Sequence, residues 1–354
     1  VGSEMCIRDR SNMEMPLGGF WQCPVTDANE IIARADAKSG KLHYVKIPHA
    51  AAYTPQDRTA GSWTPCTTAT AAKFTAAGYF FAEMLNDVLG VPVGIIDCSW
   101  GGSRVESWMS REVLSGYSDI DLTEEGISRV AQHLRPMVMY NAMLRPVAGY
   151  TVRGFLWYQG ESNVGRYMDY AARLADMVSL WRGLWGRDDL PFYYVEIAPF
   201  EYGNGKSPYL REAQCRAQEL IPNSGMICTN DLVEHYEFCN VHPKNKRDVG
   251  YRLAFMALNK TYGMKEIACQ SPQYESMEIR DGKARIRFKY MDQGFNRMAD
   301  IRGFEICGAD KVFYPADAVV ENQFALVVSS EKVPEPVACL LYTSPSPRDQ
   351  RGSR

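Results

Sequence analysis

Residues 91–102 read VPVGIIDCSWGG, and this stretch decides the fold class. A mostly apolar run of strand length ends in two glycines, which is typical of a buried strand followed by a tight turn. The preceding range 73–90 has apolar side chains at helical spacing, and Gly90 is a helix stop signal. A helix that leads directly into a buried strand is typical of a parallel α/β protein.

The same alternation continues along the chain. Strands are predicted in the ranges 153–160, 191–200 and 225–232, and helices in 167–186 and 245–263. This order predicts a parallel sheet with helices on both faces. In such sheets the chemistry lies beyond the carboxyl ends of the strands. The segments expected there are SWGGS (99–103), YQGESN (158–163) and TNDL (229–232).

From about Ser271 the apolar period changes to two. The segment 276–290 alternates, and Asp281-Gly282 within it predicts a hairpin turn. We therefore expect an α/β domain over 11–268 and a small, truncated all-β domain over 271–339.

The composition excludes some classes of partner. The chain has 354 residues, with 39 Lys+Arg against 42 Asp+Glu and a net charge of -3. That balance provides no excess of positive charge for binding nucleic acid or an anionic membrane. The apolar runs are shorter than the roughly 18–20 residues that a membrane helix needs. The sequence does not reveal the oligomeric state.

The two ends look foreign to the rest of the chain. Residues 1–10 and 340–354 are rich in Arg and Asp and have no periodicity, like translated adapter sequence at the ends of fragments from environmental DNA. On that interpretation the first strand of the sheet is missing or replaced. The alternative is a natural disordered tail at each end.

A serine and a histidine frame the α/β domain. Ser11 lies near its first strand, and His242 lies directly before its last helix. The two can meet over the edge of a parallel sheet and act as nucleophile and base. The alternative is that each is an ordinary helix cap or surface residue.

Four loop segments resemble one family when taken together: SNMEMPLGG (11–19), SWGGSRVESWMS (99–110), LWYQGESN (156–163) and NVHPKNK (240–246). The chain resembles the sialate O-acetylesterases, a carbohydrate-acetylesterase branch of the SGNH (GDSL-like) hydrolases, over roughly 11–339. The resemblance implies an SGNH-like parallel sheet flanked by helices.

The resemblance implies roles for particular residues. Ser11 is the nucleophile, although Asp9-Arg10 stand where the family has Gly-Gln before the serine. His242 is the general base. The oxyanion donors are the backbone N–H of Ser11, a backbone N–H of the Gly101-Gly102 turn and a side chain, with Gln159 preferred to Asn163. Glu161, Arg104 and Trp100 are expected to support the site or to contact sugar.

The third catalytic residue is where the sequence departs from the family. SGNH enzymes commonly place Asp three residues before the histidine, and here Cys239 stands there. Asp231 and Glu237 are the available carboxylates. We prefer Asp231 because a strand end is rigid, and a Ser-His dyad assisted by a backbone carbonyl is the alternative.

The resemblance implies a serine esterase that needs no cofactor and acts on O-acetylated sugars. Sialic acids, above all 9-O-acetyl esters, come first, and acetylated xylan or other plant glycans come second. A carbohydrate-binding relative without catalysis is the rival from another class. His235, Cys239 and His242 have metal-like spacing but lack a clear fourth ligand, so no metal site is expected. The resemblance also implies export to the periplasm or outside the cell.

Overall fold

The computed structural model describes residues 3–8, 11–20, 22–203, 205–237, 239–291, 293–295 and 301–341. Asp9 and Arg10, where the sequence departs from the family's Gly-Gln, lie outside the described residues, as do positions 342–354 of the expected foreign tail. The chain forms two compact units, residues 1–269 and residues 270–354.

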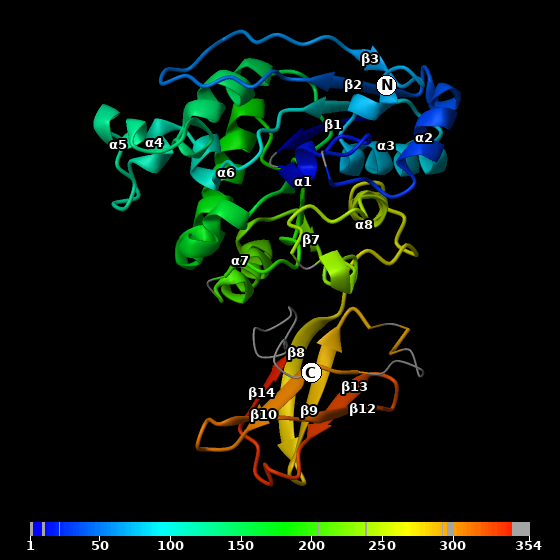
Figure 1. The fold of residues 1–354 in the computed structure, drawn as a ribbon, viewed down its shortest axis with the longest axis vertical. Helices are drawn as coiled ribbons and strands as arrows, with labels where there is room; N and C mark the ends of the chain where they lie inside the picture. Colours follow the sequence, from blue (N-terminus) through cyan, green and yellow to red (C-terminus); the bar gives the residue numbers. More distant parts are fainter. Residues whose placement is uncertain are drawn as a thin grey trace. The chain divides into compact units, whose positions relative to one another are not determined.

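A seven-stranded sheet forms the centre of the first unit (Figure 1), in the order β3-β2-β4-β1-β5-β6-β7. The β2–β3 pair is antiparallel, and the other neighbouring pairs are parallel. The expected parallel α/β fold is confirmed. The strands are β1 (Ser3–Arg8), β2 (Leu42–Lys46), β3 (Thr64–Pro65), β4 (Val93–Asp97), β5 (Phe155–Tyr158), β6 (Phe192–Val195) and β7 (Ser224–Ile227).

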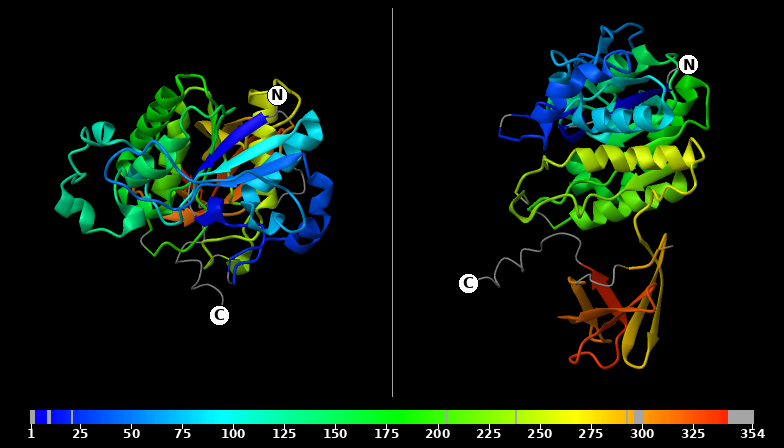
Figure 2. Two further views of the ribbon diagram at one scale, coloured as in Figure 1. Left: turned by 90° about the horizontal axis from the view of Figure 1, so that it is seen from above. Right: turned by 90° about the vertical axis from the view of Figure 1, so that its right-hand side faces the viewer.

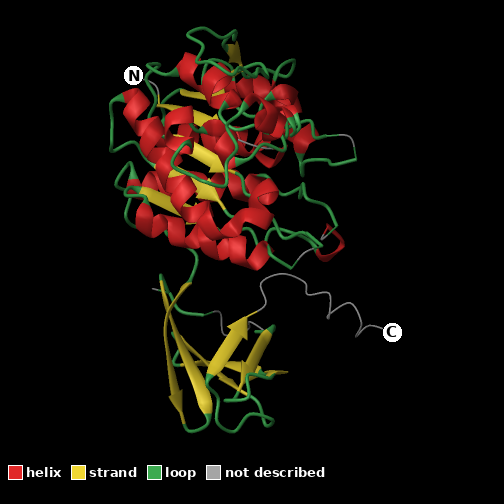
Figure 3. Ribbon diagram, turned by 90° about the vertical axis from the view of Figure 1, so that its left-hand side faces the viewer, coloured by secondary structure: helices red, strands yellow, loops and turns green. Residues whose placement is uncertain are grey.

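Helices cover both faces of this sheet (Figure 3). The α-helices are α1 (Ser11–Glu14), α2 (Ala28–Arg34), α3 (Ala76–Leu89), α4 (Arg111–Leu114), α5 (Glu124–Ser128), α6 (Tyr170–Trp185), α7 (Ser207–Leu220) and α8 (Arg247–Lys260). The short 3₁₀ or π helices are η1 (Ala35–Lys38), η2 (Ala71–Lys73), η3 (Val105–Trp108), η4 (Gln132–Leu134), η5 (Tyr140–Leu144), η6 (Arg145–Val147), η7 (Glu161–Asp169) and η8 (His235–Glu237). Among the described residues, no helix is long and apolar enough to cross a membrane.

Strand β5 illustrates how two cores form. Phe155 and Trp157 pack into the core beneath α6 and α7, whereas Leu156 and Tyr158 pack into the core beneath α3 and α8. Successive strand side chains point to opposite faces, so a strand that is apolar at every position must be covered twice. This is why the strands read as continuous apolar runs in the sequence.

Strand β1 occupies the middle of the sheet, within the segment that the sequence marks as foreign. It pairs with β4 on one side and with β5 on the other (Figure 2). The carboxyl ends of these three adjacent strands lead into Ser11, Gly101 and Gln159. Because parallel strands end at the same edge, this arrangement gathers three of the four family segments at one place.

The second unit contains two antiparallel sheets, ordered β12-β13-β9-β8 and β11-β10-β14. Asp281 and Gly282 form the predicted turn between β8 and β9, both with positive φ, as a two-residue hairpin requires. Leu340 and Leu341, placed by the sequence in the foreign tail, pair with β10. The strands are β8 (Gln273–Arg280), β9 (Lys283–Lys289), β10 (Phe304–Cys307), β11 (Phe313–Pro315), β12 (Asp317–Glu321), β13 (Ala325–Ser329) and β14 (Ala338–Leu341).

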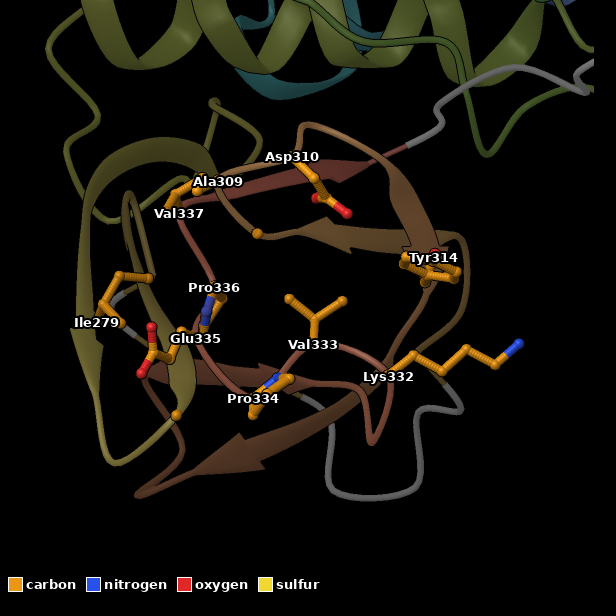
Figure 4. Close-up of a pocket in the computed structure, with 12 residues that line it drawn as sticks. Ile279, Ala309, Asp310, Tyr314, Lys332, Val333, Pro334, Glu335, Pro336 and Val337 are labelled. Carbon is orange, nitrogen blue, oxygen red and sulfur yellow. The ribbon is translucent and has the colours of Figure 1, made fainter.

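This β unit has a cavity of about 410 Å³ (Figure 4). Val333 points into it, and the prolines at 334 and 336 form one side. On another side the ammonium of Lys332 lies 5.5 Å from the ring centre of Tyr314. None of the residues expected to be catalytic lines this cavity.

Candidate active site

Ser11 lies where β1 leads into α1, against the turn that follows β4. A methyl group on Gly101 would lie 3.4 Å from the Cβ of Ser11 and 3.3 Å from Oε2 of Glu14. Glycine at 101 therefore lets the two turns approach closely. The backbone N–H of Ser11 stands at a helix start, where such groups have no acceptor within the helix.

Glu14 holds the turn after β4 in place. Its Oε2 accepts a 2.7 Å hydrogen bond from the backbone N–H of Gly101. Its Oε1 lies 3.1 Å from Nζ of Lys46 and 2.7 Å from Nε2 of His49. Burial raises the pKa of this carboxyl, but the hydrogen bond from His49 and the charge of Lys46 outweigh burial and lower it to about 2. One backbone N–H of the Gly101-Gly102 turn was expected to face the oxyanion. The N–H of Gly101 binds Glu14, whereas that of Gly102 has no acceptor among the described residues.

Asn12 joins the serine turn to the histidine loop. Its Nδ2 donates to the carbonyl oxygen of Val241 at 2.9 Å and to Oε1 of Glu161 at 3.0 Å. Its Oδ1 accepts a 2.8 Å hydrogen bond from Nζ of Lys246. Because Asn12 follows Ser11 and Val241 precedes His242, these bonds bring together two segments about 230 residues apart in the chain.

His242 has an unsatisfied ring nitrogen. Its Nε2 is buried and makes no hydrogen bond within the described part of the chain, and the ring meets Phe20 edge-on at 5.5 Å. Burial and then the charge of Lys246 lower the pKa of the imidazole, whereas the carboxylate of Glu161 acts in the opposite direction. A neutral imidazole with a bare nitrogen is able to accept a proton.

The structure does not bring Asp231 to His242. Its carboxylate receives hydrogen bonds from Nη1 of Arg252 at 2.8 Å and from Nη2 at 2.5 Å, and these bonds lower its pKa. Its side chain is 64% exposed. Glu237 is buried and instead accepts from the backbone N–H groups of Glu234 and Lys244, which organises the loop before His242. Glu161 is the carboxylate whose charge acts on His242.

Gln159 and Asn163 are fully buried and hydrogen-bonded to each other. Nε2 of Gln159 donates to Oδ1 of Asn163 at 2.7 Å and to the carbonyl of Ser103 at 3.4 Å. Nδ2 of Asn163 donates to Glu106 at 2.9 Å. Both side-chain amides expected to face the oxyanion are thus engaged in holding the loops after β4 and β5.

Trp100 and Arg104 flank the same turn. The Trp100 ring stacks on His49 with centroids 4.5 Å apart and planes 2° apart. Arg104 lines a small charged cavity of about 180 Å³ together with Glu106. The hydroxyl of Ser162 donates to the carbonyl of Gly102 at 2.9 Å, so the turn is held from a second side.

A cavity of about 540 Å³ adjoins these groups. Glu14, which binds the Gly101 N–H, and Phe20, which contacts His242, belong to its lining. Its other lining residues are Pro16, Tyr44, Lys46, Ser62, Thr64, Thr70, Ala72, Lys73 and Phe74. A concave, partly aromatic cavity with a few polar groups is the usual form of a small-molecule site.

Sequence reasoning did not identify Asn12, Glu14 or Lys246 as part of the site. Each lies within a segment that carried the resemblance. The signal that could have identified them is their position as polar residues in those segments. Among the described side chains, no group of three or more His, Cys, Asp or Glu residues is arranged to hold a metal ion.

Comparison with known proteins assigns the family. The family model described as "Carbohydrate esterase, sialic acid-specific acetylesterase" matches residues 47–259, more than half of the chain. This chain belongs to that carbohydrate esterase family. The match includes the Gly101-Gly102 turn, the Gln159–Asn163 segment and His242, whereas Ser11 precedes it.

Individual relatives agree with this assignment. A carbohydrate acetylesterase from Xanthomonas citri is 32% identical, with a TM-score of 0.84 over 97% of this chain and 76% of that chain. The mouse sialate O-acetylesterase is 27% identical over 67% of this chain and 52% of its own length. The human enzyme is 28% identical over 67% of this chain and 49% of its own. The chain thus spans about half the length of these curated relatives.

Proposed function

We propose that this chain is a serine esterase that removes O-acetyl groups from carbohydrates through an acetyl-serine intermediate. The observation that carries the proposal is the hydrogen bond from Asn12, next to Ser11, to the backbone of the His242 loop. This loop holds a buried imidazole nitrogen that has no partner among the described residues. A weakly nucleophilic hydroxyl needs a base of this kind. Membership of a carbohydrate esterase family supports the same chemistry.

The first half-reaction forms the acetyl-enzyme. The Ser11 oxygen attacks the acetyl carbonyl carbon while Nε2 of His242 takes the serine proton. The tetrahedral oxyanion is stabilised by the backbone N–H groups of Ser11 and Gly102. The intermediate collapses, the bond to the sugar oxygen breaks, and that oxygen leaves as an alcohol with the proton from His242.

The second half-reaction releases acetate. Water loses a proton to Nε2 of His242 and attacks the acetyl-serine carbonyl. The new tetrahedral intermediate expels the Ser11 oxygen, which recovers the proton from His242. Glu161 is the carboxylate that stabilises the imidazolium formed in both halves, because its charge raises the pKa of His242.

The cavity beside Glu14 and Phe20 is the proposed sugar site. It offers the hydroxyls of Ser62, Thr64 and Thr70 and the ammonium of Lys73. The Lys46 ammonium at the same cavity is already paired with Glu14 and Asp97. Hydroxyls suit the polar edges of any sugar, whereas ammonium groups suit a sugar that carries a carboxylate. This lining favours O-acetylated sialic acids, including 9-O-acetyl esters, over neutral acetylated xylan.

Acetate release from O-acetylated sialic acid, acetylated xylan and an aryl acetate tests the proposal. Ser11→Ala is compared with Ser39→Ala, which changes an exposed serine outside the site. We expect Ser11→Ala to lower kcat by about 10⁴-fold or more with the fold intact by circular dichroism, and Ser39→Ala to be unaffected. No turnover on any acetyl ester by the folded protein, with sugar affinity retained, would show a binding protein instead.

A further inference from the structure

Lys246 is a buried cation that the proposed chemistry does not use. Its side chain is fully buried at the residue before α8. Within the part of the chain that the structure describes, Nζ makes one hydrogen bond, to Asn12, and it lies 5.6 Å from the ring centre of Tyr158. Burying an ammonium is costly, and a cation at a helix N-terminus is also opposed by the helix dipole. Two physical effects therefore act against a lysine at this position.

The chemistry of the amide explains what the lysine achieves. In its protonated form Lys246 can only donate, so it requires the oxygen of Asn12 to face it. The Nδ2 group of Asn12 is then turned towards its two acceptors, Val241 and Glu161. A flipped amide would place an oxygen against the Val241 carbonyl and lose both bonds. Lys246 thus fixes the one orientation of Asn12 that connects the two loops.

We propose that Lys246 is a positioning residue for the esterase reaction, acting through Asn12 to hold the Ser11 turn and the His242 loop in one arrangement. The inference rests on the proposed function, since it assigns a role within that site. A misplacement of about 1 Å at a catalytic group costs on the order of 10²-fold in rate.

The charges around the two residues support this role. Burial lowers the pKa of Lys246 to about 7, opposed by Glu161, Glu237 and Cys23. Lys246 in turn helps to lower the pKa of His242 from the α8 side, while Glu161 raises it from the η7 side. Phe20, which also contacts the His242 ring, carries no charge. Loss of the Lys246 charge therefore moves the imidazole pKa upwards.

The test compares Lys246→Met with Lys244→Met, which removes an ammonium that contacts Tyr236 in the same loop. Both are assayed on an aryl acetate across pH, beside Ser11→Ala. We expect Lys246→Met to lower kcat by about 10²-fold with little change in KM. We also expect the acidic limb of its kcat/KM profile to shift to higher pH, while Lys244→Met matches the parent in both.

Several outcomes separate the two proposals. Full activity of Ser11→Ala refutes the serine mechanism itself. If Ser11→Ala is inactive but Lys246→Met keeps the parent kcat and acidic limb, the positioning role is wrong. Should Lys246→Met fail to fold, Lys246→Gln takes its place, because its neutral amide can donate or accept and no longer requires the Asn12 oxygen to face it. A lowered kcat with a shifted acidic limb in folded Lys246→Gln supports the role, and an unchanged kcat and acidic limb refute it.

Discussion

Two polar clusters lie behind the loops of this site, and they differ in how their charged groups are paired. The joint cluster consists of Asn12, Glu161, His242 and Lys246. The scaffold cluster consists of Glu106, Gln159, Asn163 and Arg173. Within the described residues, Nε2 of His242 in the joint cluster is buried without a partner, and the side chain of Lys246 bonds to a neutral amide.

The scaffold cluster pairs its opposite charges, although Nε of Arg173 is also buried without a hydrogen bond among the described residues. The Arg173 guanidinium donates to Oε1 of Glu106 and to Oδ1 of Asp119, each at 2.5 Å. Oε1 of Gln159 accepts from the Tyr170 hydroxyl at 2.7 Å, and Oδ1 of Asn163 accepts from two donors. In the scaffold cluster a buried carboxylate and a buried guanidinium compensate each other, whereas the Lys246 ammonium of the joint cluster bonds to a neutral amide. The contrast assigns support to one cluster and chemistry to the other.

The largest expected effect follows from breaking the scaffold cluster at Arg173. Arg173→Met leaves the buried Glu106 carboxylate without its main cation. Removal of one partner from a buried ion pair costs about 3–5 kcal/mol, because the remaining charge is uncompensated. We expect the free energy of unfolding in urea to fall by that amount. Arg187→Met, at an ion pair whose side chains are 44% and 74% exposed, is the control and should change it by less than about 0.5 kcal/mol.

If Arg173→Met were as stable as the parent, the scaffold cluster would not be a stabilising unit. Where Arg173→Met is destabilised, the combination of Glu106→Gln with Arg173→Met removes the unpaired carboxylate charge as well. A double variant more stable than Arg173→Met alone would locate the cost in the unpaired charge.

An intermediate effect is expected at Asn163, and it sharpens the comparison. Asn163→Ala removes a partner of Glu106, Gln159 and the backbone of Val105. We expect a loss of about 1–3 kcal/mol in stability from the polar groups left unpaired. Steady-state kcat on an aryl acetate should fall far less than the roughly 10²–10³-fold that loss of an oxyanion donor costs. A 10²–10³-fold fall in kcat with unchanged stability would instead identify Asn163 as an oxyanion donor.

The sequence predicted the fold class because the information for it is local. Alternating buried strands and amphipathic helices follow from residues next to one another, as in the helix that ends at Gly90. The sequence does not predict helix α7, Ser207–Leu220, because polar residues make up half of it and two arginines interrupt its apolar pattern. Tertiary contacts stabilise such a helix, and no local window contains them.

The site was predicted less completely, for the same reason. The resemblance named Ser11, Gly101 and His242, but the bonds between their segments join residues far apart in the chain. Nothing near Lys246 indicates that Asn12 faces it, 234 positions away. Asp231 was preferred because strand ends are rigid, yet the sequence does not reveal that Arg252, on α8, binds its carboxylate.

The smallest effect is expected at Asp231, and it decides which carboxylate belongs to the chemistry. Asp231→Asn weakens an ion pair to Arg252 that is largely open to solvent, so the free energy of unfolding should change by no more than about 1 kcal/mol. Because this carboxylate makes no hydrogen bond to His242 within the described residues, kcat should stay close to the parent value. Loss of the acid of a catalytic triad lowers kcat by about 10⁴-fold, which separates the alternatives clearly.

Glu161→Gln is the matched variant, since it removes the charge that acts on His242 and should lower kcat while Asp231→Asn does not. The reverse ranking would restore Asp231 as the third catalytic residue and leave Glu161 with a structural role beside Asn12.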